Sequence, residues 1–271
     1  MKKKYELTTE TRSFDGRILH RIKRIEDELI GGWIESENNL SQEGDCFVYD
    51  NAVVYGNGKV YGDAVVYDDA RVSGDARIYG NAEVCGNAEV YDYAEVYNYA
   101  EVYNNAEVRG DARIYGNAEV CGNAEVYDYA EVRGDATVYG YAEVYDDARV
   151  SGDARIYGNA MVYGNSRVFG EAMVCGKAKV WGKAEISDEN IIGQITTGYK
   201  DIFQHQCKRR VLTAILTEND EILYSIGCQN NITKEVFLDR IYNECGGLEE
   251  NPHRKEYLKL IPLIESYFRI K

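Results

Sequence analysis

Residues 74–96 read GDARIYGNAEVCGNAEVYDYAEV, and the same letters recur without a change at residues 110–132. A Val or Ile stands at every sixth position of this stretch. The spacing holds from Val48 to Ile186, through 24 consecutive positions without an insertion or deletion. Four residues after each of these positions but the last stands a small residue, which is Ala everywhere except at Gly58 and Ser166. The middle of the chain is therefore one six-residue unit, repeated.

The six-residue unit predicts a very short strand followed by a tight corner. Within Ala-x-Val the side chains alternate inward, outward and inward, as they do along a strand. The Gly-Asn, Gly-Asp or Asp-Asp that follows is a turn former, and Gly and Asn also tolerate positive φ. A period of six is typical of a single-stranded parallel β-helix. Three units to a triangular coil give about eight coils, stacked at roughly 4.8 Å, with the Val and Ala columns inside a mostly-β fold.

The repeat divides the chain into three parts. Residues 1–45 precede it as an N-terminal hairpin and cap, residues 46–190 form the β-helix, and residues 191–271 follow as a C-terminal α+β domain. Because the open ends of a solenoid expose unpaired backbone, atypical terminal units are expected at both ends to stop end-to-end growth.

Two strands are expected in the N-terminal part, at residues 4–9 and 18–25. They flank Asp15-Gly16, which is a turn signal. Ile30 is expected to keep the six-residue phase already. Residues 36–44 break that phase, as an excursion from the first coil would.

The C-terminal part predicts a small ββαα domain. Val211–Thr217 and residues 222–228 have the composition of a hairpin with its loop at 218–221. Thr233 is a candidate N-cap for a helix that ends near Gly246 and Gly247. Asn251-Pro252 predicts the start of a last helix to about residue 268, which Pro262 should kink or shorten.

The composition restricts the partners and the chemistry. The net charge of −15 argues against direct binding of nucleic acid or of an anionic membrane. No apolar run is long enough to span a bilayer, so we expect a cytoplasmic protein. The seven Cys contain no C-x-x-C pair, and Cys85, Cys121 and Cys175 replace Tyr in one outward column as expected free thiols. No cofactor or metal site is expected.

Outward positions one coil apart form columns, which are found by adding 18 to a residue number. Two columns contain only Glu over several coils, and like charges stacked one strand apart are destabilising. Either solvent and counterions screen these charges, or they form an acidic surface for a basic partner. A third column, from Arg77 to Arg149, alternates between Arg and Glu and is expected to be a salt-bridged ladder.

The repeats also contain 18 of the 24 Tyr, mostly in the outward position after Val. One interpretation is a structural ladder of rings that covers the sheet. The other is a protein-binding face, because Tyr is enriched at interfaces. The candidate partner-binding residues are therefore Glu83, Glu101 and Glu119 in one column, Glu89, Glu107, Glu125 and Glu143 in a second, and Tyr61, Tyr79, Tyr97 and Tyr115 in a third.

A second internal duplication argues against a reaction centre on the rod. Residues 67–82 recur as residues 145–160, a shift of thirteen units. Because thirteen is not a multiple of three, the second copy lies on a different side of the coil. A block that changes sides does not keep one side for a catalytic site.

The aliphatic-x-x-x-small-x spacing from Val48 to Ile186 resembles the left-handed β-helix of hexapeptide acyltransferases. The resemblance implies a left-handed coil. In that family a His on the coil acts as general base, and acyl-CoA binds between adjacent helices of a trimer. Here His20, His205 and His253 all lie outside the repeats, so no residue inherits the catalytic role.

The chain also resembles small hexapeptide-repeat proteins of phages, prophages and bacterial genomes. The similar segments are KYELT at 4–8, GRILHRI at 16–22, GGWIESENNLS at 31–41 and VYDNA at 48–52, with a short α+β tail at 211–268. Phe47 stands where Trp is common in that family. The resemblance implies a mobile-element origin more than a chemistry.

Three functions follow from these observations. The leading one is a non-catalytic β-helical scaffold that binds a protein partner, or itself, through acidic and Tyr-rich faces. The second is an acidic nucleic-acid mimic that inhibits a basic host defence or DNA-processing protein. Its charge is sparser than that of duplex DNA, with 23 acidic against 12 basic side chains in residues 46–187. The third is an acyltransferase-like enzyme.

Overall fold

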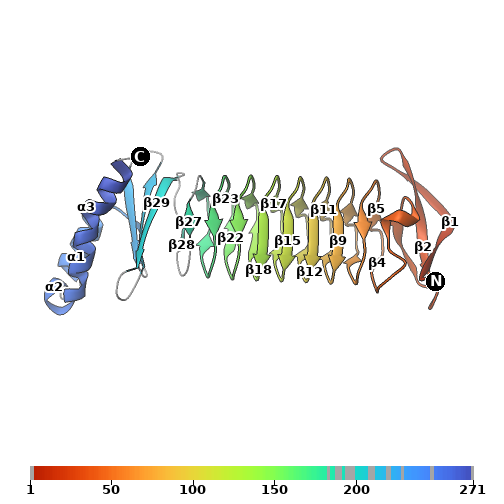
Figure 1. Ribbon diagram of the computed structural model, residues 1–271, viewed down its shortest axis with the longest axis horizontal. Helices are drawn as coiled ribbons and strands as arrows, with labels where there is room; N and C mark the ends of the chain where they lie inside the picture. The colour runs from red at the N-terminus through yellow and green to blue at the C-terminus, as the bar shows by residue number, and fades with distance from the viewer. Residues whose placement is uncertain are drawn as a thin grey trace.

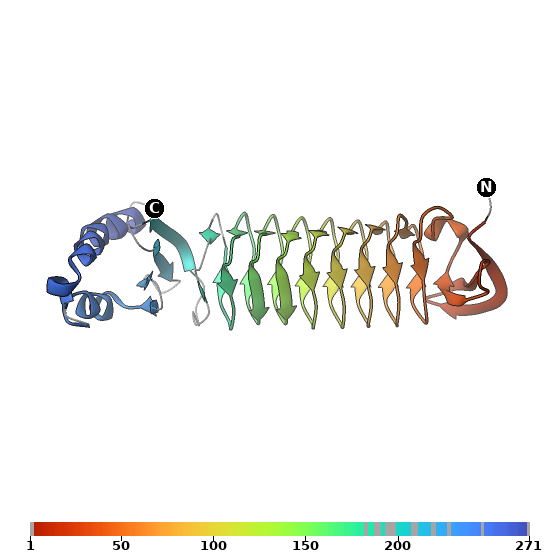
Figure 2. The ribbon, with the colours of Figure 1, turned by 90° about the horizontal axis from the view of Figure 1, so that it is seen from below.

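The computed structural model describes residues 3–181, 184–186, 191–192, 199–206, 211–217, 221–226, 229–244 and 247–269. The chain forms a rod of stacked three-sided coils, with a β-hairpin at one end and an α+β part at the other (Figure 1). Each coil gives one short strand to each of three parallel sheets, which we call face 1, face 2 and face 3 in chain order (Figure 2). The prediction of a mostly-β parallel solenoid of about eight coils is confirmed. The left hand of the coil stays a prediction.

Face 1 is an eleven-stranded sheet that also includes the N-terminal hairpin. Its strands are β1 (Tyr5–Phe14), β2 (Arg17–Arg24), β3 (Ile30–Ile34), β5 (Val53–Val54), β8 (Arg71–Val72), β11 (Glu89–Val90), β14 (Glu107–Val108), β17 (Glu125–Val126), β20 (Glu143–Val144), β23 (Met161–Val162) and β26 (Lys179–Val180).

Faces 2 and 3 are parallel throughout and belong to the coils alone. The strands of face 2 are β6 (Lys59–Val60), β9 (Arg77–Gly80), β12 (Glu95–Asn98), β15 (Arg113–Gly116), β18 (Glu131–Gly134), β21 (Arg149–Val150), β24 (Arg167–Val168) and β27 (Glu185–Ile186). Those of face 3 are β4 (Phe47–Val48), β7 (Val65–Val66), β10 (Glu83–Val84), β13 (Glu101–Val102), β16 (Glu119–Val120), β19 (Thr137–Gly140), β22 (Arg155–Gly158), β25 (Met173–Val174) and β28 (Ile191–Ile192).

The interior of the rod is the column of branched aliphatic side chains that the spacing predicts. From Val48 to Ile186, every Val or Ile of the repeat is at most 1% exposed, and the small residues Ala52 to Ala184 are almost as buried. Burying one such Val stabilises the fold by roughly 1.5–3 kcal/mol relative to exposure. Ser166 takes an Ala position, and its hydroxyl donates a hydrogen bond to the Tyr163 carbonyl at 2.9 Å. The one polar side chain in this column is therefore satisfied.

The corners explain why Asp shares a position with Gly and Asn. In every unit from Asp50 to Gly176 the residue two after the buried aliphatic one has positive φ. At Gly116 a Cβ atom would lie 2.8 Å from the Gly134 nitrogen, so only Gly fits without movement there. Asp68 instead uses its side chain, which accepts a hydrogen bond from the Gly86 backbone N–H of the next coil at 3.1 Å. This bond offsets part of the cost of left-handed backbone at Asp.

The N-terminal hairpin closes one end of the rod. Strands β1 and β2 pair through the two-residue turn Asp15-Gly16, in which both φ angles are positive. The two strands were predicted, but β1 is longer than residues 4–9. The side chains of Tyr5 and Ile22 are fully buried on the end of the coil core, and the Tyr5 hydroxyl donates to the Leu40 carbonyl at 2.7 Å.

The expectation for Ile30 is wrong. Ile30 is 47% exposed, and Ile34 is the residue of β3 that is buried in the coil core. Ile34 pairs with Val54 and Leu40 with Val60, whereas Val48 pairs with Val66. The segment between Leu40 and Val48 therefore contains two residues more than a later unit, and the six-residue phase starts only at Val48.

Residues 36–44 leave the coil, as predicted, and the first coil holds them in place. A single turn of 3-10 helix, η1 (Glu37–Asn39), begins after the N-cap Ser36. The buried Asn39 amide donates to the carbonyls of Gly56 and Gly58 at 3.0 and 2.9 Å.

A four-stranded antiparallel sheet lies between the last coil and the helices (Figure 1). Its strands, in spatial order, are β29 (Tyr199–Gln206), β30 (Val211–Thr217), β31 (Ile222–Ile226) and β32 (Gln229–Ile232). Ile215 joins the core of the rod, whereas Leu212 and Tyr224 pack against the helices. The sheet therefore covers the second end of the rod with one side and carries the helices on the other.

The predicted hairpin of β30 and β31 is present, but the prediction that the C-terminal sheet has only these two strands is wrong. The edge strands β29 and β32 are rich in polar residues, which is common at sheet edges. Because they lack an alternating apolar pattern, the sequence did not predict them as strands. Residues 218–220 of the predicted hairpin loop at 218–221 lie outside the described residues, as do Gly227 and Cys228.

The helices are α1 (Lys234–Tyr242), the short α2 (Gly247–Glu250), the 3-10 turn η3 (Pro252–Arg254) and α3 (Lys255–Arg269). Thr233 caps α1 as predicted, but the expected end near Gly246 and Gly247 is wrong, because α1 already ends at Tyr242 with Asn243 as its C-cap. Pro262 does not shorten α3, because Ile261 and Ile264 on either side of it are buried against the sheet. Within the described residues, no helix combines the length and apolar character needed to cross a membrane.

Candidate interaction surface

The two predicted Glu columns lie in register on two different faces. On face 1, Glu89, Glu107, Glu125 and Glu143 stand on neighbouring strands. On face 3, Glu83, Glu101 and Glu119 do the same. Like charges therefore stack at the spacing of hydrogen-bonded strands, which is destabilising unless donors compensate.

Donors do compensate, and most of them are Tyr hydroxyls from the preceding coil. Residues in register on neighbouring coils are 18 apart, but each donor Tyr stands 16 residues before its Glu. The Tyr follows the buried aliphatic residue of its own strand, and the Glu precedes the buried aliphatic residue of the neighbouring strand. Such bonds join Tyr67 to Glu83 (3.2 Å), Tyr79 to Glu95 (3.4 Å), Tyr103 to Glu119 (3.0 Å), Tyr115 to Glu131 (3.5 Å) and Tyr127 to Glu143 (3.1 Å), and also Tyr91 to Glu107.

Two of the bonded phenols, Tyr91 and Tyr127, are held in their neutral, proton-donating form. Burial, the charge of Glu143 and the hydrogen bond to it all raise the pKa of Tyr127. Burial and the bond to Glu107 act in the same direction on the pKa of Tyr91. The outward Tyr thus serve as fixed hydrogen-bond donors for the Glu columns, which gives them a structural role.

Arg side chains complete the compensation on faces 1 and 2. Arg71 pairs with Glu89 at 2.6 Å, and Arg109 lies between Glu107 at 3.0 Å and Glu125 at 3.2 Å. On face 2 the alternating column forms the expected ladder, with ion pairs of Arg77 to Glu95, Arg113 to Glu131, Arg149 to Glu131 and Arg167 to Glu185.

Glu101 is the exception in the Glu column of face 3. Cys85 occupies the position 16 residues before it, so no Tyr hydroxyl reaches Glu101. Its neighbours in the column are Glu83 and Glu119. Burial, then Glu119 and Glu83, raise the pKa of Glu101. This carboxylate is the weakest point of the acidic surface.

The predicted Tyr column on face 2 is a stack of parallel rings. Tyr61, Tyr79, Tyr97 and Tyr115 follow one another with ring centroids 4.8–4.9 Å apart and planes within 4°. A second stack on face 1 runs through Tyr127, Tyr145 and Tyr163 to Trp181, and Arg109 lies over its first ring. The contacts favour the structural interpretation of these Tyr over the protein-binding one.

The most exposed Tyr of the rod are four that the prediction did not include. Tyr93, Tyr99, Tyr129 and Tyr141 are 62–65% exposed. Each stands at a corner, directly before the buried Ala, where the other units have mainly Asn or Asp. A large aromatic residue in a turn position was the signal in the sequence that would have found them, because nothing in the repeat gives it a partner there.

Two of the four lie on the same corner, between face 1 and face 2. Along this corner successive coils present Asp75, Tyr93, Asp111, Tyr129 and Asp147, all exposed. We call these five residues the tyrosine–aspartate edge. Its backbone is fixed by the coil ladder, as the Tyr93 N–H donates to the Gly110 carbonyl at 2.9 Å. Tyr99 and Tyr141 stand singly on the other two corners.

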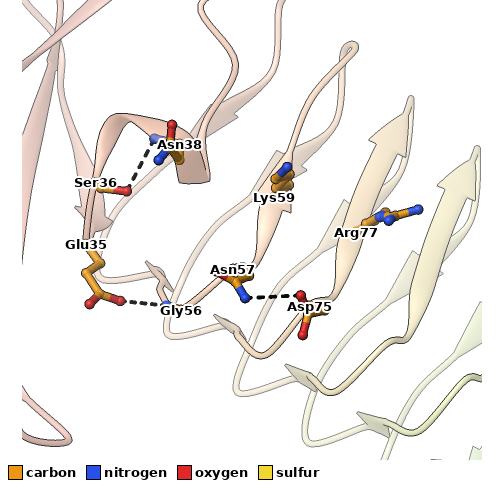
Figure 3. Close-up of a pocket in the computed structure, with 8 residues that line it drawn as sticks. All are labelled: Glu35, Ser36, Asn38, Gly56, Asn57, Lys59, Asp75 and Arg77. Atoms are coloured by element: carbon orange, nitrogen blue, oxygen red, sulfur yellow. Dashed lines mark hydrogen bonds between the residues drawn. The ribbon is translucent and has the colours of Figure 1, made fainter.

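An open hollow of about 530 Å³ adjoins the N-terminal end of this edge (Figure 3). Its lining is polar and largely satisfied, since Gly56 N–H donates to Glu35 at 2.7 Å and Asn57 donates to Asp75 at 3.2 Å. The residues that line it are Glu35, Ser36, Asn38, Gly56, Asn57, Lys59, Asp75 and Arg77. Charges of both signs and an open shape suit contact with a polar surface better than enclosure of a small molecule.

Burial raises the pKa of the Cys85 and Cys121 thiols, which keeps them in the unreactive protonated form. Across the described ranges, no group of three or more His, Cys, Asp or Glu is placed to hold a metal ion. His253 contacts the Tyr257 ring edge-on, and the side chain of His205 lies outside the described residues.

Fold and surface together define a parallel β-solenoid with capped ends. Two segments, residues 70–86 and 154–170, match the family model of the YdcK beta solenoid repeat. Each segment spans about one coil, so the match supports the repeat rather than the whole chain. The two segments start on different faces, at β8 and β22, because 154 − 70 = 84 residues is fourteen units, which is not a multiple of three. Comparison with curated proteins finds no match.

Proposed function

We propose that this protein is a non-catalytic scaffold that binds a basic protein partner along the tyrosine–aspartate edge. The observation that carries the proposal is the exposure of Tyr93 and Tyr129, at 63% and 65%, on an edge that is otherwise acidic. Exposed Tyr on a rigid backbone contributes large contact area at low entropic cost, and Tyr is enriched where binding energy concentrates.

The spacing of the edge fits an extended basic segment that lies along the rod. Tyr93 and Tyr129 are two coils apart, so their rings are separated by about 10 Å at the strand spacing. Asp111 lies between them, and Asp75 and Asp147 flank them. An Arg or Lys side chain can pair with Asp111 while it contacts an aromatic face, an arrangement that combines two attractive terms.

The capped ends support a scaffold rather than a filament. Tyr5 and Ile22 cover one end of the core, and Ile215 is buried at the other. Because described residues cover the coil core at both ends, end-to-end stacking cannot extend that core directly. Self-association would then proceed through the sides of the rod.

The test uses a partner protein that is isolated in complex with the wild-type chain. It measures the affinity of this partner for two double variants of the chain. Tyr93→Ser/Tyr129→Ser removes both rings of the edge, and Tyr99→Ser/Tyr141→Ser removes two equally exposed rings from the other corners. We expect the first variant to bind the partner at least about tenfold more weakly, and the second to bind as wild type. Equal affinity of the two variants would contradict the proposal.

Asp111→Asn and competition with duplex DNA then separate the scaffold from the nucleic-acid mimic. A scaffold contact depends on Asp111 and on the two rings, and DNA does not displace it. A mimic shares its partner's DNA site, so duplex DNA competes and the affinity falls steeply with salt. The mobile-element origin and the cytoplasmic location stay predictions.

A further inference from the structure

A second, smaller apolar cluster lies outside the coil, on the outer surface of face 1. It consists of Leu19, Trp33 and Val53, which are 0%, 6% and 1% exposed. Val53 stands in register with Arg71, so it occupies a position where later coils have charged side chains. The hairpin strands β1 and β2 supply the residues that cover this cluster.

Two guanidinium groups lie against the Trp33 ring. The central carbon of Arg12 is 4.5 Å from the ring centroid, and that of Arg21 is 4.9 Å from it. Each contact is a cation–π interaction. The same indole therefore holds two positive charges, which repel each other.

Neither charge has a carboxylate partner in the described part of the chain. Nearby Arg17 pairs with Glu35, Arg24 with Asp27 and Arg71 with Glu89. Among the described residues, the only hydrogen bond of the Arg12 and Arg21 side chains is from Arg12 Nη2 to the Asn51 carbonyl at 3.2 Å. Burial, and then the charge of Arg21, lower the pKa of Arg12. The charge of Asp69 acts in the opposite direction on the pKa of Arg12, although no carboxylate of the described residues lies within ion-pair distance of Arg12 or Arg21.

Three buried N–H donors of this cluster are also without an acceptor. They are Nε of Arg12, Nε of Arg21 and Nε1 of Trp33, and they account for three of the five such atoms among the described residues. A buried donor without a partner is costly, and most such groups in folded proteins are satisfied. Their concentration in one place indicates an interaction that the isolated chain does not complete.

We propose that Arg12, Arg21 and Trp33 form a binding site for an oxyanion, a phosphate or a carboxylate group. The terminal nitrogens of Arg21 have no partner among the described residues, and they are not among the buried atoms that lack a hydrogen bond, so they keep contact with solvent from which an anion can reach them. Guanidinium forks bind both kinds of oxyanion through paired N–H···O bonds. A bound anion would also relieve the repulsion between the two Arg charges. The site is opposite in charge to the tyrosine–aspartate edge and does not rest on the function proposed for that edge.

The chain allows a direct optical test, because Trp33 and Trp181 are its two tryptophans. Trp181→Phe keeps an aromatic ring on the Tyr163 stack and leaves Trp33 as the single tryptophan fluorophore. This variant is titrated with sodium phosphate and, separately, with sodium acetate, against sodium chloride at the same ionic strength. Arg21→Gln in the same background removes one guanidinium. Arg155→Gln, at an exposed outward position of face 3, is the matched control.

We expect a saturable change of Trp33 fluorescence with phosphate, with acetate or with both. Saturation by phosphate alone identifies a phosphate group as the ligand, and saturation by acetate alone identifies a carboxylate. Arg21→Gln should weaken the response about tenfold or abolish it, whereas Arg155→Gln should leave it unchanged. Circular dichroism confirms that each variant is folded, and Arg21→Lys serves if Arg21→Gln is not. The proposal is overturned if neither anion gives a saturable response beyond that of chloride, or if the Arg21 and Arg155 variants respond alike.

Discussion

The faces and the corners of the solenoid use the same residue in opposite ways. Tyr97 lies on a face, between the parallel rings of Tyr79 and Tyr115 at 4.8 and 4.9 Å. Tyr99, two residues later, stands on a corner and is 62% exposed. On a face, the residue one coil away is held parallel at strand spacing, so side chains stack into continuous ladders. On a corner, Tyr99 has Asn81 and Asn117 as column neighbours and no ring to stack on. Position within the unit therefore decides whether a Tyr stabilises the rod or remains available to a partner.

The largest effect is expected on the inward side of a face. Val108→Asp places a charge without a partner in the core column of face 1, and should destabilise the fold by more than about 4 kcal/mol. Glu107→Gln, the outward neighbour, is the control and should leave the fold intact. Thermal melting and the strand signal in circular dichroism measure the difference. A Val108→Asp protein that melts like the wild type would contradict the burial of this column.

The intermediate effect tests the comparison of face and corner directly. Tyr97→Ala removes two stacking contacts and should lower the free energy of unfolding by roughly 1–3 kcal/mol. Tyr99→Ala removes an exposed ring and should change it by less than about 0.5 kcal/mol. Chemical denaturation of both variants gives the two values. Equal losses would show that ring stacking on the face contributes nothing beyond what an exposed corner ring does.

The smallest effect concerns the carboxylate without a donor. The pKa of Glu101 is raised above its model-compound value of 4.5, so its ionised form destabilises the folded chain, and stability is lost as pH rises through that pKa. Glu101→Gln should therefore raise the melting temperature at pH 7 by about 1–3 °C. The gain should disappear as the pH falls below 4.5, where Glu101 is protonated in both states.

Glu119→Gln is the matched control in the same column. It relieves the same repulsion but weakens the hydrogen bond from Tyr103 at 3.0 Å, so its gain at pH 7 should be smaller. A larger gain for Glu119→Gln than for Glu101→Gln would show that the Tyr donors do not stabilise the Glu columns.

The fold was predictable because the deciding signal is local and repeated. The buried column from Val48 to Ile186, the Ala beside it and the eight coils all follow from a period of six. The expectation for Ile30 failed because a two-residue insertion before Val48 is visible only in the strand register. The strands β29 and β32 were missed because edge strands need not be apolar.

The candidate surface was predictable in its columns but not in its contacts. Adding 18 placed Glu83, Glu101 and Glu119 on one line. It did not show that the Tyr donors of Glu83 and Glu119 stand 16 residues earlier, or that Cys85 leaves Glu101 without one. The sequence also gave the stacked Tyr more weight as candidates than the corner Tyr, because spacing contains no information on exposure.

The amino-acid sequence by itself determined the architecture, since a Val or Ile at every sixth residue can be buried only by a coil of that period. Tertiary structure alone decided which outward side chains are engaged and which are free. Those contacts join residues 16 and 18 positions apart across neighbouring coils, and the hairpin brings Arg12 and Arg21 onto Trp33. Such pairings depend on how side chains lean in three dimensions, and no linear spacing specifies that.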